Sequence, residues 1–221
     1  MEEARLVCDF IERGADAAMA RDAASVRLFV LSLRWLTIYQ AALLAPVIIW
    51  AEPIVELLLG SEFGESADVL RVLAVYVFLH GLSPLVSTTV NYFGEAARRI
   101  PIVLAALALK VVLDLALIPT IGVVGAAIGV SVAYGLYVPA HLRVCRRELG
   151  FESRPLVFTL VRSLAAAAAM AAVLYAAGTD SLSLAEWLLG ATGGALAYGA
   201  VLLVTREITP SEIRRGVRTV A

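Results

Sequence analysis

Six long apolar segments, separated by short polar ones, dominate the pattern along the 221 residues of this chain. Each contains about 20 mostly apolar residues, which is the length that an α-helix needs to cross the hydrocarbon core of a bilayer. The composition agrees, since 61% of the residues are hydrophobic and only 17% are charged. The sequence therefore predicts an all-α integral membrane bundle of six transmembrane helices, at about 31–50, 70–93, 100–119, 121–142, 155–178 and 186–205.

Arginine is concentrated in every second polar segment, while the segments between them are acidic or uncharged. The basic segments contain Arg5, Arg13, Arg21, Arg27 and Arg34; Arg98 and Arg99; Arg143, Arg146, Arg147 and Arg154; and Arg206, Arg214, Arg215 and Arg218. Short segments rich in Lys and Arg stay on the cytoplasmic side of a membrane. We therefore expect a multi-pass protein of the cell (plasma) membrane with both termini in the cytoplasm. Topology and anionic lipid headgroups account for the arginines, so no nucleic-acid partner is expected.

The predicted six-span domain, 28–205, lies between an N-terminal cytoplasmic segment, 1–27, and a basic cytoplasmic tail, 206–221. The N-terminal segment places Leu6, Val7, Phe10 and Ile11 on one side of an amphipathic helix. It lacks the basic, apolar and small-residue order of a cleavable signal peptide, so the first span is expected to direct insertion. This segment is either a helix on the membrane surface or the cytoplasmic end of a helix whose upstream part is absent from this chain. We favour the second interpretation.

Motifs of the common enzyme classes are absent from the sequence. Cys8 and Cys145 fall on the predicted cytoplasmic side, where reducing conditions disfavour a disulfide. His80 and His141 lie in different spans, without a Cys-x-x-Cys or His-Glu-x-x-His spacing. Neither a phosphate-binding Gly-x-x-x-x-Gly-Lys run nor a Gly-x-Ser-x-Gly turn is present. We therefore expect no enzymatic activity, no metal site and no cofactor.

Polar residues inside the spans fall in stripes, and in lipid such residues usually face protein or a wet cavity. Four residues of the second span are spaced by three and four, and so lie on one helix face: His80, Ser83, Ser87 and Asn91. The two serines also have a purely structural interpretation, as partners for backbone groups released by Pro84. His80 and Asn91, with Gln40 of the first span, are the better candidates for lining a substrate path.

Lys110 and Asp114 place two opposite charges one helical turn apart near the middle of the third span. An unpaired charge there costs at least ~2.5–3.5 kcal/mol on insertion scales, so each is expected to neutralise the other. The pair either lines a polar path for an anionic headgroup or forms a self-contained ion pair that packs the span against its neighbours. Arg162, about two turns into the fifth span, is expected to extend to the cytoplasmic interface.

Glycines at four-residue spacing predict close contacts between helices, because small residues let helix backbones approach each other in lipid. Gly125 with Gly129, and Gly190 with Gly194, form two such faces. We assign both faces to helix packing.

The turn at 117–127 resembles the Leu-Ile-Pro-x-x-Gly-ϕ-x-Gly-Ala-Ala hairpin of polysaccharide-type flippases. Weaker matches follow the same order and spacing from about residue 25 to 175: Arg34-Trp35, Pro46, Leu59-Gly60-Ser61-Glu62-Phe63, Leu70-Arg71-Val72-Leu73-Ala74, Asn91, Gly94 and Arg98-Arg99. The chain is therefore similar to the C-terminal portion of a flippase of the multidrug/oligosaccharidyl-lipid/polysaccharide exporter superfamily.

This resemblance implies a transporter that moves oligosaccharides linked to polyprenyl phosphates to the outer leaflet, by alternating access between two lobes. It also implies that the chain is incomplete alone, since it matches the last six helices of a fourteen-helix protein. The implied partner is a missing N-terminal lobe or a second chain. Family members commonly carry amides where Lys110 and Asp114 stand, so this pair departs from the family pattern. The candidate substrate-path residues are Lys110, Asp114, His80, Asn91 and Gln40.

A different class of function is a non-transporting membrane scaffold that binds glycan-assembly enzymes through the two glycine faces. A membrane-embedded transferase is disfavoured, because no acidic, metal-binding loop faces a plausible active site.

Overall fold

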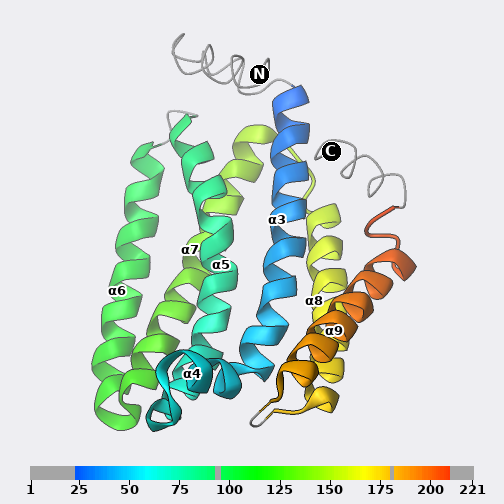
Figure 1. Cartoon of the computed structure of the whole chain (residues 1–221). Coiled ribbons are helices and arrows are strands. Elements are labelled where there is room, and N and C mark those ends of the chain that lie inside the picture. The colour runs from blue at the N-terminus through cyan, green and yellow to red at the C-terminus, as the bar shows by residue number, and fades with distance from the viewer. Residues whose placement is uncertain (1–22, 93–95, 180–181, 210–221) are drawn as a thin grey trace, which may run out of the picture.

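A computed structural model describes residues 23–92, 96–179 and 182–209 of the chain. In these residues it forms seven α-helices, one short 3-10 helix and no strand. The helices are α3 (Ala23–Ile49), α4 (Ala51–Leu59), α5 (Ser66–Tyr92), α6 (Ala96–Ile121), α7 (Val123–Leu149), α8 (Arg154–Ala177) and α9 (Leu184–Val204), with η1 (Ser61–Phe63) after α4 (Figure 1).

Six of these helices are long and apolar enough to cross a membrane, which confirms the predicted all-α bundle of a multi-pass membrane protein. They are α3 and α5 to α9. Some extend beyond the predicted spans: α3 begins at Ala23, within the predicted segment 1–27, and α7 continues to Leu149. The added turns carry arginines, whose long side chains reach water from the end of an apolar helix. The remainder of the predicted amphipathic segment, 1–22, and the predicted tail from residue 210 lie outside the described residues.

The six membrane helices pack mainly as a row rather than as a closed ring (Figure 1). The order in the row is α6, α7, α5, α3, α8 and α9, each helix packing mainly on its neighbours. The first two spans, α3 and α5, therefore lie at the centre. The hairpins α6–α7 and α8–α9 flank them, with α7 packed on α5 and α8 packed on α3. The beginning of α3 and the end of α9 lie at the same end of the bundle, as an even number of spans requires (Figure 1).

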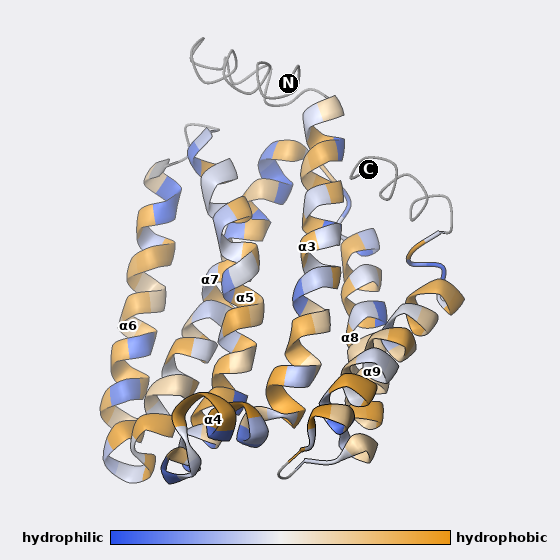
Figure 2. Cartoon of the chain, in the orientation of Figure 1, coloured by the Kyte–Doolittle hydropathy of each residue, from blue (hydrophilic) through white to orange (hydrophobic). Residues whose placement is uncertain are grey.

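A short helix, α4, lies at the opposite end of the bundle, where the sequence predicts only an acidic connection (Figure 1). Ala51 and Val55, one turn apart, are buried against Ala67 of α5. On the other side Leu57 and Leu58 are 72% and 73% exposed. Figure 2 shows that much of this helix is hydrophobic. One apolar face packed on protein and a second one exposed at the end of the spans are typical of a helix at the membrane interface.

The sharp turn predicted at 117–127 is confirmed, because a single residue, Gly122, connects α6 to α7. Helix α6 continues through Pro119 to Ile121. The backbone at Gly122 has φ +61°, a region that glycine enters without the steric cost of a Cβ atom. The Gly122 N–H donates to the Ile118 carbonyl at 2.9 Å, and the Gly125 N–H donates to the Gly122 carbonyl at 3.0 Å. The two helices are thereby held as a tight hairpin.

Both predicted glycine faces are confirmed as close helix contacts. A Cβ atom added at Gly125 would lie 2.7 Å from the carbonyl carbon of Leu117 in α6. A Cβ atom added at Gly194 of α9 would lie 3.0 Å from Leu174 Cδ2 in α8. A Cβ atom added at the neighbouring Gly190 would lie 2.6 Å from Cζ2 of the Trp50 ring. Each glycine face thus lets one membrane helix approach another closely.

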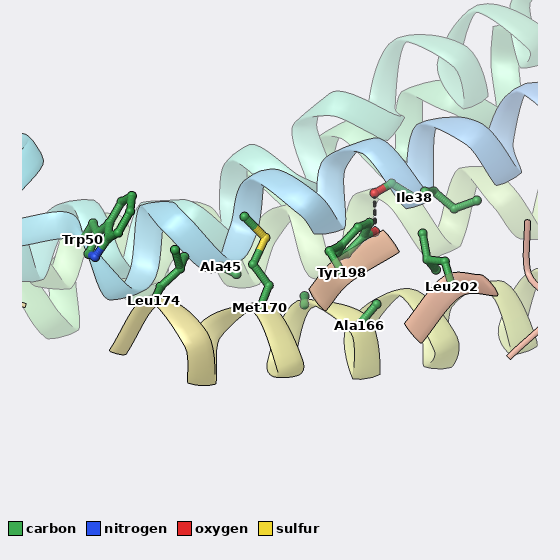
Figure 3. Packing of buried hydrophobic residues seen from close by; sticks show 9 residues of the cluster. Ile38, Ala45, Trp50, Ala166, Met170, Leu174, Tyr198 and Leu202 are labelled. Atoms are coloured by element: carbon green, nitrogen blue, oxygen red, sulfur yellow. Dashed lines mark hydrogen bonds between the residues drawn. The ribbon is translucent and has the colours of Figure 1, made fainter. Parts of the chain in front are cut away.

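A buried cluster joins α3, α8 and α9 (Figure 3). It includes Ile38 and Trp50 from the first span and its end, Leu174 from α8, and Tyr198 from α9. The Tyr198 hydroxyl donates to the Ile38 carbonyl at 2.6 Å, and Trp50 Nε1 donates to the Gly178 carbonyl at 3.1 Å. Both aromatic residues therefore combine apolar burial with a satisfied polar group, which fixes α8 and α9 against α3.

Candidate functional site

The predicted pairing of Lys110 with Asp114 is confirmed. Lys110 Nζ forms a close ion pair with Asp114 Oδ2, one turn along α6. The two side chains are 38% and 20% exposed, so the pair is only partly covered. Asp114 Oδ1 is buried without a hydrogen-bond partner and lies against Gly129 of α7, where any side chain would collide with it. The absence of a side chain at Gly129 therefore leaves room for the Asp114 carboxylate beside α7. The Lys110 side chain is the more exposed member of the pair.

Gln40 lies between α3 and α5, away from the ion pair. Its side chain covers Gly81 of α5, whose missing Cβ leaves the space that the amide occupies. Gln40 Oε1 is buried without a hydrogen-bond partner. An unsatisfied amide oxygen is costly in an apolar interior, so Gln40 is a buried polar side chain whose hydrogen-bonding capacity is not met by the described residues.

His80 lies at the boundary of α5 and α7, within an aromatic group. Its ring stacks on Tyr76 with centroids 5.2 Å apart, and it meets Tyr134 of α7 edge to face at 5.5 Å. Tyr76 and Tyr134 also contact each other, at 4.8 Å. His80 is nevertheless exposed. The ring is thus oriented by two tyrosines while part of it stays accessible.

The predicted polar stripe of α5 divides into a buried part and an exposed part. Ser83 and Ser87 are buried, whereas His80 and Asn91 are exposed. Ser87 Oγ donates to the Pro84 carbonyl at 3.4 Å, not to the carbonyl four residues before the proline. Two further exposed residues, Pro84 and Thr88, lie between His80 and Asn91 at four-residue spacing. The exposed face of α5 is therefore shifted from the predicted one.

The five candidate residues do not form one constellation. Lys110 and Asp114 meet on α6, Gln40 lies between α3 and α5, His80 lies between α5 and α7, and Asn91 is near the end of α5. Among the described residues, no hydrogen bond or ion pair joins the Lys110–Asp114 pair to the other three. Their role in lining a substrate path remains a prediction.

Sequence reasoning missed the most highly connected charged group in the described part of the chain, which is centred on Glu207. Its side chain is 4% exposed, just beyond the end of α9. Oε1 accepts hydrogen bonds from Arg34 Nε of α3 at 3.0 Å and from Thr159 Oγ1 of α8 at 2.6 Å. Oε2 accepts from Arg162 Nη1 at 3.0 Å, and the Glu207 carbonyl accepts from Arg34 Nη2. One carboxylate therefore ties three helices together.

The Glu207 cluster adds a partner to the expectation for Arg162. The sequence predicts that this side chain extends to the interface, and it reaches a buried carboxylate just beyond the end of α9 while remaining 40% exposed. Burial raises the pKa of Glu207, yet hydrogen bonds from Thr159, Arg162 and Arg34 outweigh it and hold that pKa below its ordinary value. Glu207 is therefore ionised at neutral pH, with both carboxylate oxygens already engaged.

The chain reaches this geometry through an unusual helix end. The Arg206 N–H donates to the Leu203 carbonyl at 3.0 Å, and the Glu207 N–H donates to the Leu202 carbonyl at 2.9 Å. This is the bonding pattern of a Schellman cap, in which the first residue after the cap adopts a left-handed conformation. Arg206 occupies that position with φ +56°, where glycine is usual. The reversal directs Glu207 back toward α3 and α8.

Two signals in the sequence could have indicated this cluster. Arg154, Phe158 and Arg162 follow one another at four-residue spacing, which places them on one face of α8. Glu207 follows directly on the last apolar span, where an acidic residue is at odds with the surrounding arginines. The partners themselves, 173 and 45 residues away, are set by the helix packing.

Among the residues described, no group of three or more His, Cys, Asp or Glu side chains could hold a metal ion. No protein-family model and no curated protein matches the chain. Its function is therefore inferred from the membrane fold and the geometry of these sites.

Proposed function

We propose that this membrane protein is the C-terminal portion of an oligosaccharide-lipid flippase and that it works with a further lobe of helices. In this proposal it belongs to the multidrug/oligosaccharidyl-lipid/polysaccharide exporter superfamily, lies in the plasma membrane with both termini in the cytoplasm, and moves polyprenyl-phosphate-linked oligosaccharides outward. The proposal rests on the resemblance at 117–127 and on one structural observation, the partly exposed ion pair of α6.

The position of that pair supports a covering partner. Helix α6 lies at the edge of the row and packs mainly on α7, so most of its surface faces away from the described chain. Lys110 and Asp114 lie near the middle of this 26-residue helix, in the hydrocarbon region of a bilayer. Charged groups exposed to hydrocarbon are costly. A second lobe, or a wet path between two lobes, gives the exposed ammonium group a polar environment.

Alternating access supplies a use for the same arrangement. Substrate sites of such transporters lie near the bilayer midplane between two elements that move against each other. The phosphate groups of the substrate are anionic, and Lys110 is the charged donor at that depth. Asp114 neutralises it when no substrate is present. The exposed side chains of Asn91 and His80 on α5 supply further polar contacts for a glycan.

The test measures binding and transport by the purified chain with a fluorescent polyprenyl-diphosphate-linked oligosaccharide. We expect the chain to bind this lipid, and the paired change Lys110→Leu with Asp114→Leu to weaken binding by at least about tenfold, the equivalent of ~1.4 kcal/mol. The matched control removes another ion pair, between α6 and α7 outside the midplane, through Arg98→Gln with Glu148→Gln. That control should bind as the unmodified chain does.

Transport is followed in proteoliposomes by quenching of the labelled lipid in the outer leaflet. The chain alone should leave the inner-leaflet fraction unquenched, because alternating access needs the second lobe. Transbilayer movement by the chain alone would contradict the proposed incompleteness. Failure to bind the labelled lipid would contradict the flippase proposal itself. It would not favour a scaffold that binds enzymes through the two glycine faces, because both faces are occupied by contacts within the chain.

A further inference from the structure

A cavity of about 400 Å³ opens beside the Glu207 cluster, where α3, the first turns of α8 and the end of α9 meet. Its charged lining residues are Arg34, Arg154, Arg162, Arg206, Glu152 and Glu207. Four arginines and two glutamates give it a formal charge of +2. A basic pocket between membrane helices at the end of their spans is the setting in which proteins hold anionic lipid headgroups.

Glu207 organises the cavity rather than repelling an anion from it. Both carboxylate oxygens accept hydrogen bonds from the protein. Of these three hydrogen bonds, two come from the guanidinium groups of Arg34 and Arg162. The carboxylate is 4% exposed, whereas Arg162 remains 40% exposed. An arginine carries five N–H donors, and one of those of Arg162 is used here. The pair therefore fixes the guanidinium while most of its donors stay available at the cavity.

One face of α8 presents two guanidinium groups that contact the same aromatic ring. The guanidinium carbons of Arg154 and Arg162 lie 5.7 and 5.8 Å from the centre of the Phe158 ring. These cation–π contacts hold both guanidinium groups beside a ring that also lines the cavity. The N-terminus of α8 begins at Arg154, and its N-cap Ser153 makes no capping hydrogen bond through its side chain. The positive end of the helix dipole therefore adds to the charge of the two side chains.

The surface beside the cavity is apolar, which determines the kind of anion. Val157 and Val161 of α8 are 55% and 58% exposed, and Leu203 and Val204 of α9 are 42% and 82% exposed. These side chains lie on the membrane helices within one to two turns of the basic residues. A ligand with a phosphate group at the cavity and hydrocarbon along these helices matches both surfaces.

We propose that this cavity binds the phosphate headgroup of an anionic phospholipid, with its acyl chains against α8 and α9. Arg154, Arg162 and Arg206 contact the phosphate, and Glu207 is a positioning residue. Arg206 occupies a left-handed backbone position that suits glycine. The helix end therefore does not itself require an arginine there, whereas phosphate binding does. This inference does not depend on the transport function proposed above.

The test is native mass spectrometry of the full chain released from detergent containing phosphatidylglycerol or phosphatidylcholine with identical acyl chains. We expect preferential retention of phosphatidylglycerol. Each of Arg154→Gln and Arg206→Gly should reduce this retention about fivefold, the equivalent of the ~1 kcal/mol that a basic residue contributes near an anionic membrane surface. The matched control is Arg143→Gln, an exposed arginine of α7 that does not line the cavity. It should change retention less than about twofold.

Arg206→Gly keeps the fold testable, because glycine suits the left-handed backbone at this position. Equal retention by the Arg154, Arg206 and Arg143 variants would overturn the proposal. A second arm adds inorganic phosphate to the lipid-free chain and records thermal stability. One result would overturn the lipid assignment: millimolar phosphate stabilises the chain, Arg154→Gln abolishes that stabilisation, and the chain shows no preference for phosphatidylglycerol. The cavity would then be assigned to a soluble phosphate compound.

Discussion

The close approach of α6 and α7 makes Gly125→Ala a sharp test of the packing. The added methyl group would lie 2.7 Å from the Leu117 carbonyl carbon and 2.8 Å from both its carbonyl oxygen and its Cβ atom. Ordinary contacts begin at 3.4 Å, so α6 must withdraw by about 0.7 Å, the difference from 2.7 Å. The obstacle is mostly backbone, which cannot rotate away. Overpacking of this kind costs about 1–3 kcal/mol.

Gly135→Ala is the matched control on the same helix, because an added Cβ there meets nothing within 4 Å. It isolates the helix propensity of alanine, which is favourable over glycine by up to about 1 kcal/mol. The same gain applies at Gly125, so relative to this control we expect Gly125→Ala to lower the free energy of unfolding by the overpacking cost alone, about 1–3 kcal/mol. The measurement is an SDS titration of the protein in mild detergent, followed by circular dichroism. Equal free energies for the two variants would refute the close contact of α6 with α7.

Three further predictions concern the Glu207 cluster. Glu207→Gln should lower the free energy of unfolding by about 1–3 kcal/mol, less than a fully buried pair because its arginine partners remain partly hydrated, whereas exposed Glu152→Gln should change it by less than about 0.5 kcal/mol. Because the pKa of folded Glu207 lies below its ordinary value of 4.5, its stabilising effect is complete above that pH and is lost as the pH falls through the folded value. Unfolding curves should therefore show a steeper loss of stability below pH 4.5 for the unmodified chain than for Glu207→Gln, and parallel losses would contradict the lowered pKa. Arg206→Gly should raise the free energy of unfolding by about 1 kcal/mol by relieving the left-handed backbone, and a loss of stability would be evidence against that conformation.

The membrane helices and their closest contacts could be predicted because each depends on local sequence. A span is defined by its length and apolar composition, and the turn at Gly122 depends on one residue that accepts a positive φ. Pairing of Lys110 with Asp114 follows from their separation by four residues on one helix. Gly125 and Gly129 likewise predict a close helix contact, although their spacing does not predict that α6 is the partner.

The remaining features depend on which helices become neighbours, and that is not local. Glu207 finds Arg34 across 173 residues because α9 and α3 both pack on α8. Helix α4 was missed because its acidic residues on one face resemble those of a loop, while its burial depends on Ala67 of another helix. The exposed part of the α5 stripe shifted because Ser83 and Ser87 are buried in the bundle, where α5 packs on both α7 and α3, and spacing alone does not contain this packing.

The spatial order of the row also has a consequence for synthesis. Among the six described membrane helices, α3 and α5 are synthesised before the other four and lie at the centre of the row, so each later pair has only an outer edge to join. The hairpin α6–α7 can dock on α5 as soon as it is inserted, and α8–α9 can then dock on the other side, on α3. No helix has to be displaced to admit a later one. The membrane domain can thus be assembled outward from its middle, in the order in which the chain is translated.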